Sequence, residues 1–206
     1  MEFGFGRGKR YCYLKRGLDA LFSALLLLFL LLPMLLIAVM IRLTSRGPAL
    51  FRQVRVGRNG AHFVCLKFRT MVMDAPADCP SSEMAHDRFV TPLGRFLRRT
   101  SLDELPQLWN VLLGQMSLVG PRPLIPNEGE VHEWRRRGGV YRLRPGMTGL
   151  SQISGRDFLP DAEKARLDVR YARSLSFRTD LSVLLRTISR IFSGDGIQQN
   201  SSRVDQ

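Results

Sequence analysis

The pattern of hydrophobic and polar positions divides the chain into an apolar stretch near its start and a mixed remainder. Residues 20–41 carry no charge, and within them only Ser23 and Pro33 are not hydrophobic. About 20 apolar residues are enough to cross a bilayer as a helix. No small-residue cleavage site of the kind that ends a secretory signal follows Met40. We therefore expect a membrane helix that stays on the mature protein.

The flanks of this stretch indicate how it sits in a membrane. Five basic residues stand on each side of it: Arg7, Lys9, Arg10, Lys15 and Arg16 before, and Arg42, Arg46, Arg52, Arg55 and Arg58 after. Positive charge favours the cytoplasmic side, so balanced flanks place both ends there. Pro33 removes a helical hydrogen bond and bends the helix. A re-entrant hairpin satisfies both observations, whereas hydropathy alone favours an ordinary single-pass helix.

Beyond the apolar stretch the periodicity changes to that of strands. Two alternating runs predict a β-hairpin over 49–71, because an Asn-Gly turn at 58–60 separates them. A polar stretch at 73–87 predicts a mobile loop beside the hairpin. A short basic helix is expected over 91–99, and a second helix over 100–114, where a glycine stops it.

The last third of the chain predicts more helix. We expect helices around 128–137, 162–175 and 179–194, and a structured loop over 142–156, which is rich in glycine and contains a proline. The 179–194 helix is amphipathic, and its apolar side consists of Leu181, Leu184, Leu185, Ile188, Ile191 and Phe192. Such a side packs either on the protein core or on a membrane surface, and the N-terminal apolar stretch favours the membrane.

These elements predict an α+β fold that is mostly helical. Residues 1–47 form the basic N-terminus and re-entrant membrane helix, and 48–193 form a cytoplasmic domain on the membrane surface. That domain contains the small β-hairpin, a helical core and interfacial amphipathic helices. Residues 194–206 are expected to be a flexible tail.

Charge narrows the choice of partner. The chain has 31 Lys and Arg against 18 Asp and Glu, a net charge of +13, which points to nucleic acid, an anionic membrane surface or a phosphorylated substrate. No helix-turn-helix, RNA-recognition strand pair or zinc module is present, so we expect no nucleic-acid partner. Cys12, Cys65 and Cys79 lack zinc-ligand spacing and are read as reduced thiols.

The adjacent acids Asp103 and Glu104 are the first candidate for chemistry. Their neighbours Ser101 and Leu102 fit a helix capping box, and acids in a first helical turn also interact favourably with the helix dipole. Pro106 complicates a cap at Ser101, whereas a cap at Asp103 leaves it in the tolerated first turn. Neighbouring helical residues point about 100° apart. One acid could therefore attack a substrate while the other holds a metal ion.

Several basic residues stand where the backbone holds them in place. Lys67 and Arg69 lie on the second predicted strand among apolar neighbours, and Arg122 lies between Pro121 and Pro123. A surface arginine is usually just a solvated charge. Cations held in place by strands and prolines suit a diphosphate. Neither a Walker nor a dinucleotide-binding glycine motif is present, so those phosphate sites are excluded.

Four stretches carry a resemblance to a known family. They are KFRTM at 67–71, LGRFLRRTSLDELPQLWNVLLGQMSLVGPRP at 93–123, RPGMTGLSQISGR at 144–156 and LDVRYARSLSFRTDL at 167–181. With the membrane stretch ahead of them, in this order, the chain resembles the monotopic phosphoglycosyl transferases, also called bacterial sugar transferases. It is similar to a small member that consists of little more than the catalytic core.

The resemblance implies transfer of a sugar phosphate from a UDP-sugar to polyprenol phosphate, with release of UMP, at the cytoplasmic face of a bacterial inner membrane. It implies Asp103 as nucleophile and Glu104 as a ligand of Mg²⁺. Phosphate contacts are implied for Lys67, Arg69, Arg122 and Arg144, and pocket roles for Gln152 and Asp168.

The family's membrane helix is broken at a proline, commonly preceded by serine, and this chain has Leu32-Pro33 there. Membrane lipids are a further expected partner, and a homodimer is left open. The rival hypothesis is a membrane-anchored scaffold whose basic domain recruits other proteins.

Overall fold

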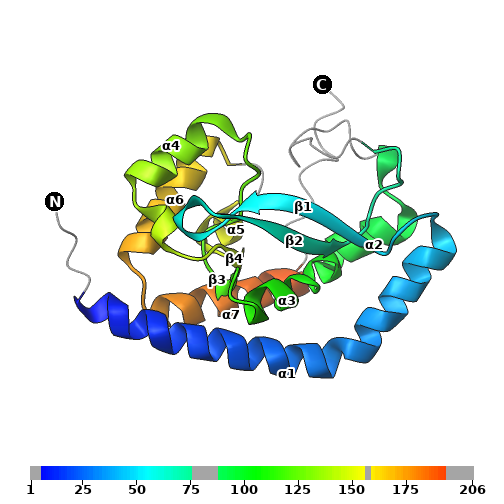
Figure 1. The fold of residues 1–206 in the computed structure, drawn as a ribbon, viewed down its shortest axis with the longest axis horizontal. Helices are drawn as coiled ribbons and strands as arrows, with labels where there is room; N and C mark the ends of the chain where they lie inside the picture. The colour runs from blue at the N-terminus through cyan, green and yellow to red at the C-terminus, as the bar shows by residue number, and fades with distance from the viewer. Residues whose placement is uncertain (1–5, 76–87, 156–158, 194–206) are drawn as a thin grey trace.

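The computed structural model describes residues 6–75, 88–155 and 159–193. The predicted tail at 194–206, and the part of the predicted mobile loop at 76–87, lie outside the described residues. The fold is α+β and mostly helical, as expected (Figure 1). In chain order the elements are α1 (Gly6–Thr44), β1 (Leu50–Val56), η1 (Arg58–Gly60), β2 (His62–Phe68), α2 (Pro92–Thr100), η3 (Leu102–Glu104), α3 (Gln107–Leu112), β3 (Ser117–Val119), α4 (Gly129–Arg137), η4 (Val140–Arg142), β4 (Gly146–Thr148), α5 (Leu150–Ser154), α6 (Asp161–Arg173) and α7 (Phe177–Ser193).

The predicted hairpin is confirmed. Strands β1 and β2 pair antiparallel, with Phe51 opposite Lys67. The chain reverses through the 3-10 turn η1, where Asn59 and Gly60 have φ angles of 57° and 77°. Because side chains alternate along a strand, Arg55 and Lys67 stand on the same face of the hairpin. The hairpin therefore presents two cations on one side.

Helix α1 is the longest element and runs beneath the rest of the molecule, bending upward toward α2 at its far end (Figure 1). Pro33 lies inside it. Within the described residues, this is the one helix whose length and composition would let it cross a membrane, and 17% of its most apolar window is buried inside the protein. Most of its large apolar side chains are exposed.

Both ends of α1 are attached to the same body. Near the start, Lys15 Nζ lies 2.6 Å from Asp180 Oδ2 on α7. Just past the other end, the Arg69 guanidinium donates to the backbone carbonyls of Ser45 and Arg46. The helix is therefore held at both ends by the domain that follows it.

A hydrophobic cluster joins the second half of α1 to the domain. Ile37 and Ile41 of α1 pack with Phe68 of β2 and Leu97 of α2, and all four are buried. These four apolar side chains, from three elements, are removed from water together, and their burial stabilises the contact between α1 and the domain. The second half of α1 therefore forms one wall of a core.

The single helix predicted over 100–114 is wrong. The structure instead has the 3-10 turn η3, followed by the six-residue α3. Pro106 has no N–H to donate to the Leu102 carbonyl, and the Leu105 N–H bonds that carbonyl at 3.3 Å. This bond spans three residues, so the chain tightens into a 3-10 turn before α3 begins.

The structured loop predicted over 142–156 is also wrong. Residues 146–148 form β4, which pairs parallel with β3, and residues 150–154 form α5. A Cβ atom on Gly146 would lie 2.0 Å from the Gly120 nitrogen, so the glycine allows two backbones to approach closely. Two of the glycines that suggested a loop, Gly146 and Gly149, instead lie directly against the backbone of Gly120, which follows β3.

Candidate active site

The acid pair lies on a tight turn between two helices. Asp103 and Glu104 belong to η3, which joins α2 to α3. Ser101, just before them, has a left-handed backbone with φ of 58°, and its side chain makes no capping hydrogen bond. Helix α3 begins only at Gln107, after Pro106. Both capping alternatives are therefore wrong, and the acids do not form the first turn of an α-helix.

The turn packs against the hairpin through a direct ion pair. Lys67 Nζ on β2 donates to Glu104 Oε1 at 2.7 Å, and both side chains are about a quarter exposed. Asp103 is more deeply placed, with 9% of its surface exposed. The structure thus brings together three residues that the sequence proposed: Lys67, Asp103 and Glu104.

The surroundings of Asp103 change its acidity. The pKa of Asp103 is raised to about 6: burial is the largest cause and the neighbouring Glu104 carboxylate adds to it, while the positive charges of Lys67 and Arg98 oppose the shift. The lowered pKa that a helix N-terminus would give is not found, because Asp103 lies in a largely buried 3-10 turn. With a pKa of about 6, roughly nine in ten Asp103 side chains are ionised at pH 7.

The sequence marks Arg98 only as one residue of the basic helix predicted over 91–99. It lies on α2, five positions before Asp103, and its Nε donates to Thr70 Oγ1 at 2.9 Å. Its charge lowers the pKa of Asp103. The available signal was the close spacing of the basic run at 95–99 and the acid pair.

Arg55 is a second residue that sequence reasoning missed as part of the site. Its guanidinium donates to the Pro123 carbonyl at 3.0 Å. Burial lowers the pKa of Arg55, as does the charge of Arg122, while Glu104 acts in the opposite direction. Arg55 therefore interacts with the charges of both Glu104 and Arg122, and it also pairs with Glu128 at 3.8 Å. The hairpin register could have indicated Arg55, since it shares a face with Lys67.

Arg69 and Arg144 are bonded to backbone carbonyls. Arg69 binds the end of α1, as described above, and its Nε is buried without a hydrogen-bond partner. Arg144 Nε donates to the Gly114 carbonyl, beyond α3, at 2.7 Å. Burial and the charges of Arg58 and Arg16 lower the pKa of Arg144. The structure therefore places Arg144 near the N-terminal part of α1, and its phosphate contact stays a prediction.

Asp168 and Gln152 lie within the helical end of the domain. Asp168 is fully buried, pairs with Arg135 and accepts a hydrogen bond from Ser151 at 2.9 Å. Burial raises the pKa of Asp168. Gln152 donates to the Met147 carbonyl at 2.8 Å. Contact of Asp168 with a substrate would require its buried ion pair to open, and both pocket roles stay predictions.

The acid pair fits a magnesium ion that a substrate also helps to bind. Two adjacent carboxylates repel each other, as the raised pKa of Asp103 reflects, and a divalent cation offsets that repulsion. Mg²⁺ is commonly held by one or two carboxylates together with water and substrate phosphates. In the described part of the chain, no group of three or more His, Cys, Asp and Glu side chains could hold a metal. These residues therefore do not form a metal site from protein ligands alone.

Comparison with known proteins identifies the family. A family model described as bacterial sugar transferase matches residues 10–194, a range that includes the hairpin, the acid pair and α7. The chain belongs to the bacterial sugar transferase family. Among its relatives, the UDP-glucose:undecaprenyl-phosphate glucose-1-phosphate transferase of Caulobacter vibrioides is 43% identical over 190 residues, covering 88% of this chain and 70% of the relative.

Two further relatives in the family are longer. The UDP-galactose-lipid carrier transferase of Erwinia amylovora is 40% identical over 202 residues, which cover 89% of this chain and 41% of that protein. The UDP-glucose:undecaprenyl-phosphate glucose-1-phosphate transferase of Klebsiella pneumoniae is 40% identical over 185 residues, which cover 86% and 40%. The chain thus spans about two fifths of the length of these two curated relatives.

Proposed function

We propose that this bacterial sugar transferase moves a sugar phosphate from a UDP-sugar to polyprenol phosphate, releases UMP and so starts a glycan. The observation that carries the proposal is the buried Asp103 carboxyl beside the Lys67–Glu104 ion pair, at 2.7 Å. The names of the relatives, which include transfer of glucose 1-phosphate from UDP-glucose to undecaprenyl phosphate, support the reaction class.

The proposed reaction has two displacements at one phosphorus atom. In the first, an Asp103 oxygen attacks the phosphorus that bears the sugar. The bond from that phosphorus to the bridging oxygen breaks, and UMP leaves with that oxygen. In the second, a phosphate oxygen of polyprenol phosphate attacks the same phosphorus, the bond to Asp103 breaks, and the carboxylate is restored. The soluble donor and the lipid acceptor therefore never need to react with each other directly.

In this scheme the cations of the site offset the negative charge of the donor. An anionic carboxylate is repelled by an anionic phosphorus centre, so positive charge must offset the donor's pyrophosphate. Lys67, Arg98 and Arg122 contribute that charge from three directions, since they come from β2, α2 and the segment after β3. When bound, Mg²⁺ held by Glu104 would further offset charge on the phosphate oxygens.

We propose further that the protein is monotopic, on the cytoplasmic face of a bacterial inner membrane. The domain contacts α1 at both ends, through Asp180 at Lys15 and through Arg69 at Ser45. A body on one side of a bilayer cannot hold both ends of a helix that spans it. These two attachments support a helix that enters and leaves by one face, with Pro33 near its bend.

The reaction is tested with purified protein and a panel of UDP-sugars. UMP release is measured with polyprenol phosphate and Mg²⁺, and mass spectrometry of protein given donor alone should find a sugar phosphate on the peptide that contains Asp103. Chelation with EDTA should stop release. Asp161→Asn, which changes an exposed acid, is the matched control for Asp103→Asn. A folded Asp103→Asn protein that releases UMP at the parent rate would refute the nucleophile, and a scaffold would release none with any donor.

The topology is tested with single cysteines in a background that lacks the three native ones. Gly8→Cys and Asn59→Cys place one thiol on each side of the apolar stretch. An impermeant maleimide added to intact cells should label neither, and both should be labelled after lysis. Labelling of one alone from outside would establish a spanning helix.

A further inference from the structure

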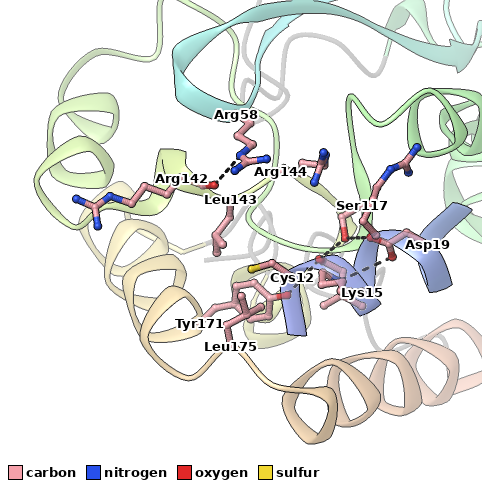
Figure 2. Close-up of a pocket in the computed structure, with 12 residues that line it drawn as sticks. Cys12, Lys15, Asp19, Arg58, Ser117, Arg142, Leu143, Arg144, Tyr171 and Leu175 are labelled. Carbon is pink, nitrogen blue, oxygen red and sulfur yellow. Dashed lines mark hydrogen bonds and ion pairs between the residues drawn. The ribbon is translucent and has the colours of Figure 1, made fainter. Parts of the chain in front are cut away.

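A pocket lies between the N-terminal part of α1 and the domain above it (Figure 2). Its volume is about 60 Å³, and its lining comes from α1, the hairpin turn η1, the segment around Arg144, strand β3 and the C-terminal end of α6. Figure 2 shows Cys12 and Lys15 on the α1 side, with Arg58 and Arg144 facing them from above. No step of the proposed reaction is assigned to this pocket, although Arg144, for which the family resemblance implies a phosphate contact, is one of its lining residues.

Three guanidinium groups around the pocket are positioned by backbone carbonyls. Arg58 Nε donates to the Arg142 carbonyl at 3.0 Å, and Arg144 Nε donates to the Gly114 carbonyl at 2.7 Å. Arg16 donates to two carbonyls of α3, each at 2.7 Å. A carbonyl positions a guanidinium but does not neutralise it. Each guanidinium has five N–H donors, so Arg58 and Arg144 retain donors for a ligand.

The acidic group in the pocket is already bonded. Asp19 accepts hydrogen bonds from the Ser117 hydroxyl at 2.7 Å and from the Leu118 N–H at 3.2 Å. Lys15, which also lines the pocket, is paired with Asp180. Burial lowers the pKa of Arg144, and the charges of Arg58 and Arg16 repel that of Arg144 and lower its pKa further, while the Asp19 carboxylate acts in the opposite direction. An anion between these guanidinium groups would turn that repulsion into attraction.

The pocket is separate from the acid pair. Arg16 and Arg144 bind carbonyls at the C-terminal end of α3, whereas Asp103 precedes its N-terminal end. A six-residue helix is about 9 Å long. The pocket also lies where the polar part of α1 gives way to the apolar stretch, because Asp19 is the last charged residue before it. This is the level at which lipid phosphates would meet the protein.

We propose that this pocket binds a phosphate group, with Arg58 and Arg144 as its direct donors. The group comes from an anionic phospholipid headgroup or from a soluble phosphate, since both present the same oxygens to a guanidinium. The site would hold the protein at the depth of the headgroups, and it does not depend on the chemistry of Asp103.

Cys12 supplies a local reporter, because it lines the pocket and is partly exposed, whereas Cys65 is buried. With Cys79 replaced by Ser, the full-length protein in neutral detergent is alkylated with iodoacetamide, and modification of Cys12 is followed by mass spectrometry. One arm adds inorganic phosphate against chloride of equal ionic strength. The other adds phosphatidylglycerol against phosphatidylcholine. At ligand ten times above its Kd, alkylation should slow about tenfold, because the free fraction falls as 1/(1 + [L]/Kd).

The variants decide whether the arginines cause the protection. Arg58→Gln and Arg144→Gln, made singly, should lose it, while Arg52→Gln on β1 should keep it. Asp103→Asn should also keep it, so that a failure of the reaction scheme is distinguishable from a failure here. Circular dichroism and an unchanged Cys12 rate without ligand confirm folding. Protection in one arm alone identifies the source of the phosphate. Absence of protection in both arms, or equal protection in both arginine variants, overturns the proposal.

Discussion

Lys15 and Asp180 are 165 residues apart in the sequence, and their side chains meet with 2.6 Å between Nζ and Oδ2. Both are largely shielded from water, with 14% and 7% of their side chains exposed. Asp180 also accepts hydrogen bonds from the hydroxyls of Tyr11 and Tyr171, each at 2.6 Å. A single carboxylate on α7 therefore joins the start of α1 to α6 and α7.

Asp180→Asn should destabilise the protein strongly. The change leaves Lys15 with a neutral partner in a shielded site, and breaking a buried ion pair costs about 3–5 kcal/mol. The free energy of unfolding in urea, measured in detergent micelles, gives the loss. Glu133→Gln is the control, because Glu133 pairs with two exposed arginines on α4, and its loss should change little. Equal effects of the two substitutions would contradict a special role for Asp180.

Asp103→Asn should stabilise the protein while abolishing the reaction. The pKa of about 6 in the folded protein lies above the ordinary value of 3.8 for an aspartate, so burying the charged form costs free energy. The parent protein therefore becomes less stable as the pH rises from about 4 to about 6. Above pH 6 the full free-energy cost of burying the charged carboxylate remains. A shift of about two units corresponds to roughly 3 kcal/mol. Urea unfolding from pH 4 to 8 should show the variant's advantage growing across that window, and a constant difference would argue against it.

The acid limb of the pH profile should report the same group. UMP release should fall as pH drops through about 6, because Asp103 becomes protonated. Lys67 lowers the pKa of Asp103, so Lys67→Gln should move this limb to higher pH in addition to slowing the reaction. Arg99→Gln, an exposed change on α2, is the control and should leave the limb in place. A limb that does not move in Lys67→Gln would mean that another group controls it.

Helix α7 should contact the membrane through three exposed apolar side chains, Leu181, Leu185 and Ile188. Leu184 packs against the core cluster and is unsuitable for a test. Leu185→Asp with Ile188→Asp should weaken binding to anionic liposomes in a flotation assay, because two charges would enter the interface. Ser182→Asp with Ser189→Asp adds the same charge at two exposed positions and should weaken it less. Equal loss would indicate a purely electrostatic effect.

The elements with strong local signals could be predicted from the sequence. The hairpin follows from alternation around Asn59-Gly60, and α1 follows from 22 uncharged residues in a row. The acid pair could be located from its composition and its setting in a basic region. These signals depend on neighbouring residues and need no knowledge of distant contacts.

The remaining features depend on contacts across the chain. The pKa of Asp103 is raised chiefly because the turn is buried against β2 and α2, and no local sequence pattern predicts that burial. Gly146 was read as a turn residue, although it lies against Gly120 in a pair of parallel strands. The proximity of Arg144 to Arg58 and Arg16 arises in the same way, because three separate segments meet there.

The attachment of α1 also bears on how this protein can be purified. Ile37 and Ile41 complete a cluster with Phe68 and Leu97, and Arg69 needs the carbonyls at the end of the helix. Removing the first 47 residues to obtain a soluble fragment would uncover that cluster and leave a buried guanidinium without its acceptors. Such a fragment would aggregate rather than fold. We therefore expect α1 and the domain that follows it to unfold as one cooperative unit, and detergent or lipid to be needed from the first step of purification.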